Sequence, residues 1–138
     1  MTNALETADK LHKKVKFFFI GALDETGFPS IKAVLPVNKR ESIRQIYFST
    51  NTSSRHVTQY RTNPNSCVYF ADFMFFKGVS LKGTMEILKD AETKERFWNK
   101  GDEKYYSKGV TDPDYCILRF TPHEGRYYHA FKSKDFVI

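Results

Sequence analysis

The chain has 138 residues, of which 41% are hydrophobic and 28% are charged, and its formal net charge is +6. This length suits one domain with its own core, and the composition excludes a disordered chain. The longest apolar run, Phe17 to Ile20, is far shorter than the about 18 residues of a membrane-spanning helix. We therefore expect one soluble domain over residues 1–138 and no membrane partner.

The N-terminal segment and the cysteines bear on the cellular compartment. Met1 to Glu6 has no apolar centre of a signal peptide, so nothing in it directs the chain to export. Cys67 and Cys116 lie in apolar segments without Cys-x-x-Cys spacing, which favours buried free thiols over a redox pair. The sequence therefore predicts a cytoplasmic protein.

The first half of the chain mixes helix and strand patterns. Apolar residues recur at helical spacing in an amphipathic N-terminal helix: Leu5, Ala8, Leu11 and Val15. Residues 17–23 and 30–37 read as a hairpin around a Gly-containing turn, and residues 46–50 form a third strand after the polar turn 38–42. A short helix is predicted over residues 54–61, because the following Asn63-Pro64 cannot continue it.

The second half is mostly strands. Strands are predicted over residues 67–73 and 79–88, and Asp90 caps a helix that runs to Trp98. Residues 100–107 are a candidate second short helix. A hairpin of strands 115–120 and 126–131 around a turn at 122–125 follows, and residues 136–138 are a candidate last strand. Because strands outnumber helices and follow one another through short turns, we predict a mainly β fold, an antiparallel sheet closed into a small Greek-key barrel with flanking helices.

One stretch carries recognisable chemistry. Five hydroxyl side chains and a guanidinium stand where a predicted strand meets a predicted helix: Ser49, Thr50, Thr52, Ser53, Ser54 and Arg55. Free N–H groups and the dipole at a helix start favour an anion, and hydroxyls and Arg donate to phosphate oxygens. The alternative is that Thr52 or Ser53 only caps the helix while the other hydroxyls are solvated. The residues alone leave both interpretations open.

The wider sequence around this stretch resembles a known family. The run from Tyr47 to Arg55, then Gln59 and Asn63-Pro64, resembles the pyridoxamine 5'-phosphate oxidase-like family of FMN-binding split barrels. Residues 29–36 and 79–86 extend the match, which covers roughly residues 15–98. The resemblance implies a six-stranded antiparallel Greek-key split barrel as a single FMN-binding domain, and a homodimer with FMN between the subunits.

The resemblance also implies which residues hold the cofactor. In the family the hydroxyl-and-basic segment holds the phosphate, as the match implies for Thr50, Ser54 and Arg55. The strand that matches Lys32 to Val37 lies along the flavin, and a basic residue at the position of Lys32 reaches the phosphate. His56 stands where the oxidases have Lys and is mostly neutral at pH 7, and Lys77 adjoins Gly78, where they place a glutamine. The predicted cofactor-binding residues are Lys32, Ala33, Val34, Leu35, Phe48, Ser49, Thr50, Ser54, Arg55, His56 and Lys77.

The function implied is that of an FMN-dependent oxidoreductase acting on a small molecule. The C-terminal substrate segment of the pyridoxamine phosphate oxidases is not recognisable, and the second half of the chain looks more like the short general-stress-protein branch. No Gly-x-Gly-x-x-Gly motif is present, so NAD(P)H as electron donor would bind transiently. No side chain is predicted to be catalytic. A flavin-holding protein without turnover, and a deazaflavin or haem in place of FMN, remain alternatives.

Two other kinds of site are weighed against this one. A nucleic-acid-binding β-barrel is an alternative, but the basic residues are dispersed and never exceed two in a row, so no nucleic-acid partner is predicted. The four histidines lack metal-ligand spacing, so no metal site is predicted. The aromatic residues of Phe73 to Phe76, and Trp98, belong either to the core or to a dimer or flavin contact.

Overall fold

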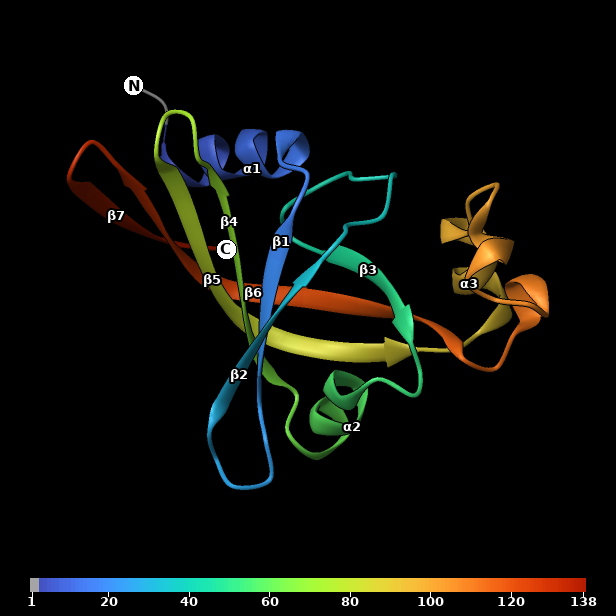
Figure 1. The fold of residues 1–138 in the computed structure, drawn as a ribbon. Helices are drawn as coiled ribbons and strands as arrows, with labels where there is room; N and C mark the ends of the chain where they lie inside the picture. The colour runs from blue at the N-terminus through green and yellow to red at the C-terminus, as the bar shows by residue number, and fades with distance from the viewer. Residues whose placement is uncertain (1–2) are drawn as a thin grey trace.

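The computed structural model describes residues 3–138 as one antiparallel sheet with helices around it (Figure 1). The helices are α1 (Ala4–Lys14), α2 (Arg55–Thr62) and α3 (Ala91–Phe97), with short 3-10 helices η1 (Asp102–Lys104) and η2 (Gly109–Thr111). The strands are β1 (Phe18–Leu23), β2 (Pro29–Val34), β3 (Ile46–Asn51), β4 (Asn65–Asp72), β5 (Lys77–Leu88), β6 (Tyr115–His129) and β7 (Lys132–Val137). The predicted mainly β, antiparallel fold with flanking helices is confirmed, with seven strands where six were predicted.

The sheet curls around a core but does not close. The strand order is β2-β1-β4-β5-β6-β3, with β7 paired to β6, so β2 and β3 form the two facing edges. Within residues 3–138 these edges meet at one isolated bridge between Pro36 and Phe48, beside which Val37 N donates to Tyr47 O at 3.2 Å. The barrel is therefore split along this line, and closure of the sheet was predicted wrongly.

The predicted turn at residues 122–125 is absent, because β6 runs straight through it. Lys82 pairs with Glu124 while Gly83 pairs with Pro122, so His123 is an extra residue in a β-bulge. A side chain at Gly83 would collide with the backbone of Thr121 and Pro122, and one at Gly125 would collide with the side chains of Phe136 and Leu81, so both glycines are required by close packing within the sheet. The reversal comes later, before β7.

The helix ends follow from capping residues in the sequence. Ser54 caps α2 by accepting a hydrogen bond from Val57 N at 3.3 Å, and Asp90 caps α3 by accepting one from Thr93 N at 3.0 Å. Both helices lie where they were predicted, within one residue. Figure 1 shows α1 across one end of the sheet, α2 at the other, and α3 in a lobe beyond β3.

Side chains along the strands point either into the core or to the surface. Phe18 packs against Phe48 and Phe70 with ring centroids 5.6 and 5.0 Å apart, and all three are fully buried. Cys116 is buried as predicted, but Cys67 is exposed, because its neighbour Val68 takes the inward position on β4. No helix within residues 3–138 has the length and hydropathy of a membrane span.

Candidate functional site

A cavity of about 530 Å³ lies in the split between β2 and β3, and we call it the split cavity. Its walls come from the end of β2 and the following loop, from the end of β3, from the start of α2 and from the segment around η1. The lining residues are Lys32, Ala33, Val34, Leu35, Pro36, Val37, Asn38, Ser49, Thr50, Asn51, Ser54, Asn99, Asp102, Tyr105 and Tyr106.

The two strand edges beside the cavity have free hydrogen-bonding groups. Within residues 3–138, β2 forms a ladder with β1 alone and β3 forms one with β6 alone. The N–H and C=O groups on their facing edges, away from the Pro36 bridge, are therefore left for a ligand or water. A flat ligand with several polar edge atoms suits such a slot.

The structure sorts the hydroxyl-rich segment into two groups. Thr52 Oγ1 donates to Pro113 O at 2.9 Å, and Ser53 N donates to Asp114 Oδ1 at 2.8 Å, so these two residues fasten the loop to the turn before β6. The hydroxyl-bearing residues that line the cavity are Ser49, Thr50 and Ser54. Since Ser54 is the cap of α2, the alternative in which Thr52 or Ser53 caps the helix is not what the structure shows.

The charge around the cavity is positive at one end and negative at the other. Lys32 lines it at the β2 edge, and neither Lys32 nor the exposed Arg55 has a side-chain hydrogen bond or ion pair within residues 3–138. Asp102 lies in the opposite wall, where one of its carboxylate oxygens accepts a hydrogen bond from Asn99 N at 2.8 Å. An anionic group is therefore favoured at the end near Lys32 and the start of α2.

His56 has an unsatisfied ring nitrogen near this positive end. Its Nε2 is buried without a hydrogen-bond partner among the described residues. Burial, and to a lesser degree the charge of Lys32, lower the pKa of His56 below its usual value, so the free protein holds the ring neutral at pH 7. A buried polar atom without a partner is costly, and a bound acceptor such as a phosphate oxygen would satisfy it.

The predicted site residues divide between the split cavity and other places. Seven of them line the cavity together: Lys32, Ala33, Val34, Leu35, Ser49, Thr50 and Ser54. Phe48 is fully buried in the core, and Arg55 and His56 lie in the first turn of α2 without lining the cavity. Lys77 begins β5, three strands from β2 in the sheet, which is about 14 Å at the usual strand spacing. The subunit alone therefore does not bring Lys77 to the others.

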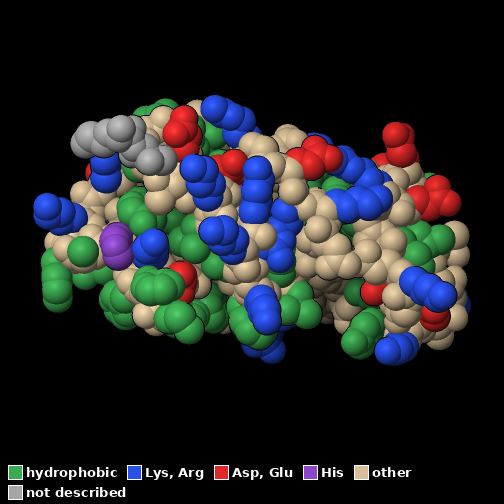
Figure 2. Space-filling view, turned by 90° about the horizontal axis from the view of Figure 1, so that it is seen from above, with side chains coloured by type: hydrophobic (Ala, Val, Ile, Leu, Met, Phe, Trp, Pro, Cys, Tyr) green, Lys and Arg blue, Asp and Glu red, His purple; other side chains and the backbone are tan. Residues whose placement is uncertain are grey.

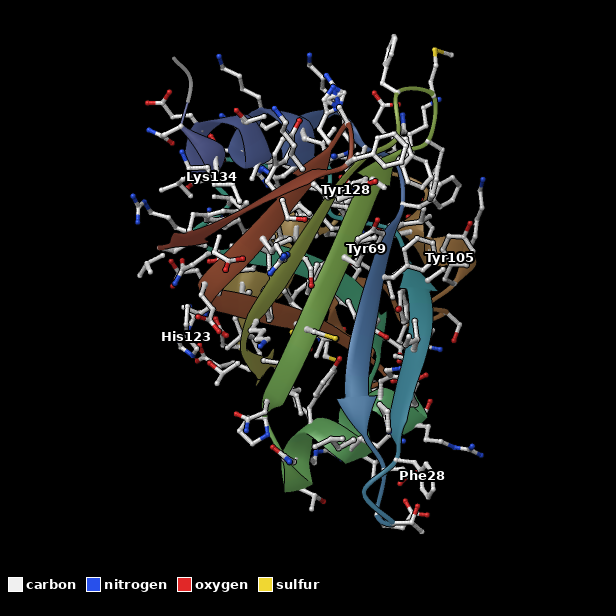
Figure 3. The ribbon with its side chains drawn as sticks, turned by 90° about the vertical axis from the view of Figure 1, so that its left-hand side faces the viewer. Phe28, Tyr69, Tyr105, His123, Tyr128 and Lys134 are labelled. Atoms are coloured by element: carbon white, nitrogen blue, oxygen red, sulfur yellow. The ribbon has the colours of Figure 1, made fainter. Side chains whose placement is uncertain are left out.

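The wall around η1 was missed from the sequence. Tyr106 is fixed there by its hydroxyl, which donates to Asn51 Oδ1 at 2.8 Å, and by packing on Tyr115 at 4.9 Å. Tyr105 next to it is 77% exposed at the rim of the cavity, beside β2 (Figure 3). The tyrosines were visible in the sequence, but no local pattern says which distant strand they face.

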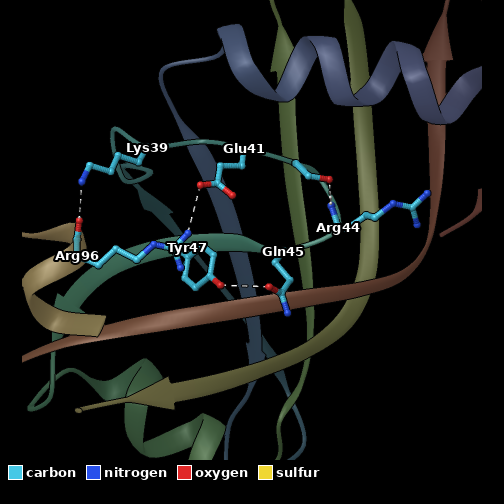
Figure 4. Close-up of a pocket in the computed structure, with 7 residues that line it drawn as sticks. Lys39, Glu41, Arg44, Gln45, Tyr47 and Arg96 are labelled. Atoms are coloured by element: carbon cyan, nitrogen blue, oxygen red, sulfur yellow. Dashed lines mark hydrogen bonds and ion pairs between the residues drawn. The ribbon is translucent and has the colours of Figure 1, made fainter. Parts of the chain in front are cut away.

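A second pocket, of about 360 Å³, lies between the segment from Lys39 to Tyr47 and Arg96 (Figure 4). Lys39 Nζ donates to Arg96 O at 3.2 Å, and Arg96 pairs with Glu41 at 3.4 Å. The Arg96 guanidinium also lies over the rings of Tyr47 and Phe97, at 5.4 and 4.7 Å. Two of the cations in this pocket are thus already engaged, and no group of three or more metal-ligating side chains occurs within residues 3–138.

Comparison with known proteins places the chain in a family. The family model described as pyridoxamine 5'-phosphate oxidase matches residues 4–129. The chain belongs to this family. The predicted resemblance is thereby confirmed, and the match includes both strands that border the split cavity. A search of curated proteins found no match.

Solved structures agree with this assignment. A Clostridium acetobutylicum protein related to general stress protein 26 of B. subtilis, of the pyridoxinephosphate oxidase family, is 40% identical with a TM-score of 0.86, over 97% of this chain and 94% of that one. General stress protein 26 from Bacillus anthracis shares the fold, with 17% identity, a TM-score of 0.77 and 94% of each chain covered. A heme binding protein from Mycobacterium smegmatis also shares it, with 13% identity, a TM-score of 0.77 and coverage of 99% of this chain and 59% of that one.

Proposed function

We propose that the protein binds FMN in the split cavity and acts as an oxidoreductase on a small molecule. The observation that carries this proposal is that seven predicted cofactor residues, scattered over residues 32–54, line one cavity between two free strand edges. A positive end, hydroxyl groups and a helix start suit the phosphate, and the free edge of β2 suits the polar atoms of a flat ring.

The residues have separate roles in this proposal. Thr50, Ser54 and Lys32 hold the phosphate, Arg55 reaches it from the first turn of α2, and His56 Nε2 gains the acceptor that it lacks. The backbone edge from Ala33 to Leu35 orients the ring. When bound, FMN supplies the electron-transfer chemistry, and the protein's part is to anchor it, orient it and leave one side open to a substrate and to NAD(P)H.

We also propose that the active form is a cytoplasmic homodimer. The outer face of β2, β1 and β4, seen in Figure 3, carries large exposed apolar side chains: Phe17 is 57% exposed, Ile31 74%, Leu35 65% and Tyr69 42%. Monomeric proteins rarely leave such a contiguous apolar patch in water. A second copy packed on this face would bury it.

The absorption spectrum of the purified protein tests the cofactor. Flavin absorption, or quenching of the fluorescence of added FMN on binding, is the expected result. A haem spectrum would assign the cavity to a different group, and a colourless protein that does not bind added FMN would contradict the proposal. A steady-state assay with NAD(P)H and an acceptor then separates an enzyme from a protein that only holds flavin.

A further inference from the structure

The proposed cofactor uses only one of the two charged residues that line the split cavity. These residues are Lys32 and Asp102. The proposed function assigns Lys32 to the phosphate and gives Asp102 no part. A bound phosphate neutralises Lys32, so the carboxylate of Asp102 is then the one unpaired charge among the lining side chains.

Asp102 is held firmly in the cavity wall. One of its carboxylate oxygens accepts a hydrogen bond from Asn99 N at 2.8 Å, and its own N donates to Asn99 O at 3.0 Å. The other carboxylate oxygen has no partner within residues 3–138. The same wall contains the packed rings of Trp98, Tyr106 and Tyr115, whose centroids are 4.9 to 6.1 Å apart. A fixed carboxylate with a free oxygen is suited to a cationic group.

Tyr105 stands beside Asp102 at the mouth of the cavity. Tyr105 N donates to Asp102 O at 2.9 Å, and residues three apart in such a turn lie on the same side of it. Both residues line the cavity, and Figure 3 shows Tyr105 next to β2. Its exposed ring contacts no other aromatic ring in the described part of the chain. Because the face of an aromatic ring attracts cations, the ring and the carboxylate favour the same kind of ligand.

The rest of the surface favours the opposite charge. The net charge of the chain is +6, and Figure 2 shows Lys and Arg side chains spread over the α1 side of the molecule. Such a surface attracts anions in general. Lys100 and Lys104 adjoin Asp102 in the sequence, but neither lines the cavity. A preference for a cation would therefore be set by Asp102 and Tyr105 and not by the overall charge.

The cation that suits this wall is organic. Within residues 3–138 no group of three or more His, Cys, Asp or Glu side chains is placed to hold a metal ion. Hard metal ions require several oxygen ligands, and Asp102 is the one carboxylate in the cavity lining. An organic cation needs one carboxylate and a surface on which its apolar part can pack.

We propose that the substrate is a small organic cation, whose charge is bound by the carboxylate of Asp102 and by the ring face of Tyr105. That this cation is a substrate rests on the proposed function, whereas the binding site itself does not depend on FMN. Asp102 and Tyr105 set the specificity of binding, and neither takes part in the chemistry.

Two dyes of similar size and opposite charge test the carboxylate by equilibrium dialysis. Near neutral pH methylene blue is a cation and dichlorophenolindophenol is an anion. Asp102→Asn, which keeps an oxygen for Asn99 N, should weaken binding of methylene blue about three- to tenfold and should not weaken binding of the anion. Glu103→Gln removes the same charge at the next residue, outside the cavity lining, and should change neither affinity. Equal losses in both variants, or none in Asp102→Asn, would overturn the proposal.

Substitutions of Tyr105 test the ring face separately. Tyr105→Leu should weaken binding of methylene blue about two- to fivefold, because the ring face is lost, and should weaken binding of the anionic dye less. Tyr105→Phe keeps a ring face and should bind both dyes as the wild type does. An equal loss of both dyes in Tyr105→Leu would overturn the part given to Tyr105.

Comparison of binding with and without FMN keeps this inference separate from the proposed function. The weaker binding of methylene blue to Asp102→Asn is expected in both conditions. If the protein binds no FMN and still shows this loss, the cation site stands and the proposed function fails.

Kinetics with FMN bound test whether the cation is a substrate. NAD(P)H supplies the electrons, and bleaching of each dye on reduction gives its KM. Asp102→Asn should raise the KM for methylene blue by the same factor as its dissociation constant and leave kcat unchanged. An unchanged KM beside weakened binding would overturn the substrate class.

Discussion

The split cavity and the second pocket contain similar side chains but differ in what those side chains already bind. In the second pocket, Lys39 donates to a backbone carbonyl and Arg96 is paired with Glu41 and stacked on aromatic rings. In the split cavity, Lys32 has no such partner among the described residues, and nearby His56 Nε2 lacks one as well. Residue composition alone would predict an anion site in both pockets. The cations of the second pocket are already paired, whereas Lys32 in the split cavity is not, so only the split cavity is a candidate anion site.

Unsatisfied polar groups therefore indicate a binding site better than charge does. Groups satisfied within the protein gain little from a ligand, whereas a ligand at the split cavity adds hydrogen bonds where none exist. The helix start at Ser54 and the free edges of β2 and β3 also favour ligand binding in the split cavity.

The largest effect is expected for Arg55→Ala. Loss of a charged hydrogen bond to phosphate should weaken FMN binding about 100-fold, or about 2.7 kcal/mol, measured by quenching of FMN fluorescence. The melting temperature should stay the same, because Arg55 is exposed and has no side-chain partner within residues 3–138. Arg96→Ala in the second pocket is the control and should leave FMN affinity unchanged. Equal affinity for FMN in the Arg55 variant would mean that the anchor lies elsewhere.

A smaller loss is expected for Lys32→Met, which removes a charge at the positive end of the split cavity. FMN affinity should fall about tenfold, since the ammonium is a single mobile donor without the fork of an arginine. Lys39→Met makes the same change in the second pocket, where Nζ already donates to Arg96 O. If both variants lost the same affinity, the contrast between the pockets would be an effect of net charge.

The pH dependence of binding should show the part that His56 plays. Burial lowers the pKa of His56 in the free protein, and a bound phosphate would raise it, so FMN binding takes up a proton. Affinity should therefore rise several-fold as the pH falls from about 8 to about 6.5, above most of the titration of the phosphate itself. Riboflavin, which has no phosphate, is the matched ligand and should show no rise. His56→Lys should bind FMN tightly at both pH values, and a persistent slope in that variant would exclude His56.

The smallest effect is expected for Glu41→Gln, which frees Arg96 in the second pocket. Glu41 is 78% exposed in its pair with Arg96, so the variant should lose no more than about 0.5 kcal/mol of stability. Inorganic phosphate should then shift the side-chain NMR signal of Arg96 in the variant and not in the wild type. A shift in both proteins would show that the ion pair between Arg96 and Glu41 does not prevent this pocket from binding phosphate.

Much of the fold was predictable because its signals are local. Ser54 and Asp90 are N-cap residues that indicate the starts of α2 and α3 within one turn of chain. In β5, alternation of apolar and polar residues indicates a strand. The course of β6 was not predictable in this way. Pro122 and Gly125 read as a turn, and only the pairing with β5, about 40 residues earlier, shows that the chain continues straight with a bulge at His123.

The site residues also divide into those that a local sequence pattern indicates and those that only the fold brings together. The hydroxyl segment was found because its members are neighbours in sequence, although only the fold shows that Thr52 and Ser53 serve the loop instead of the cavity. The wall with Asp102 and Tyr105 could not be found, because it meets β3 through tertiary packing that leaves no local pattern. The prediction that Lys77 binds the cofactor comes from the resemblance alone. Its position on β5, three strands from β2, does not support that prediction within one subunit.

The position of β6 sets the order in which the protein can be assembled. Its first half pairs with β3 and its second half with β7, while β5 runs along nearly its whole length, so β6 joins strands from distant parts of the chain. During synthesis β3 leaves the ribosome about 65 residues before its partner and must wait unpaired, and such long-range closure is slow. The β3 wall of the split cavity is thus completed only after β6 has paired with β3. Gain of cofactor binding during refolding would accordingly report this pairing.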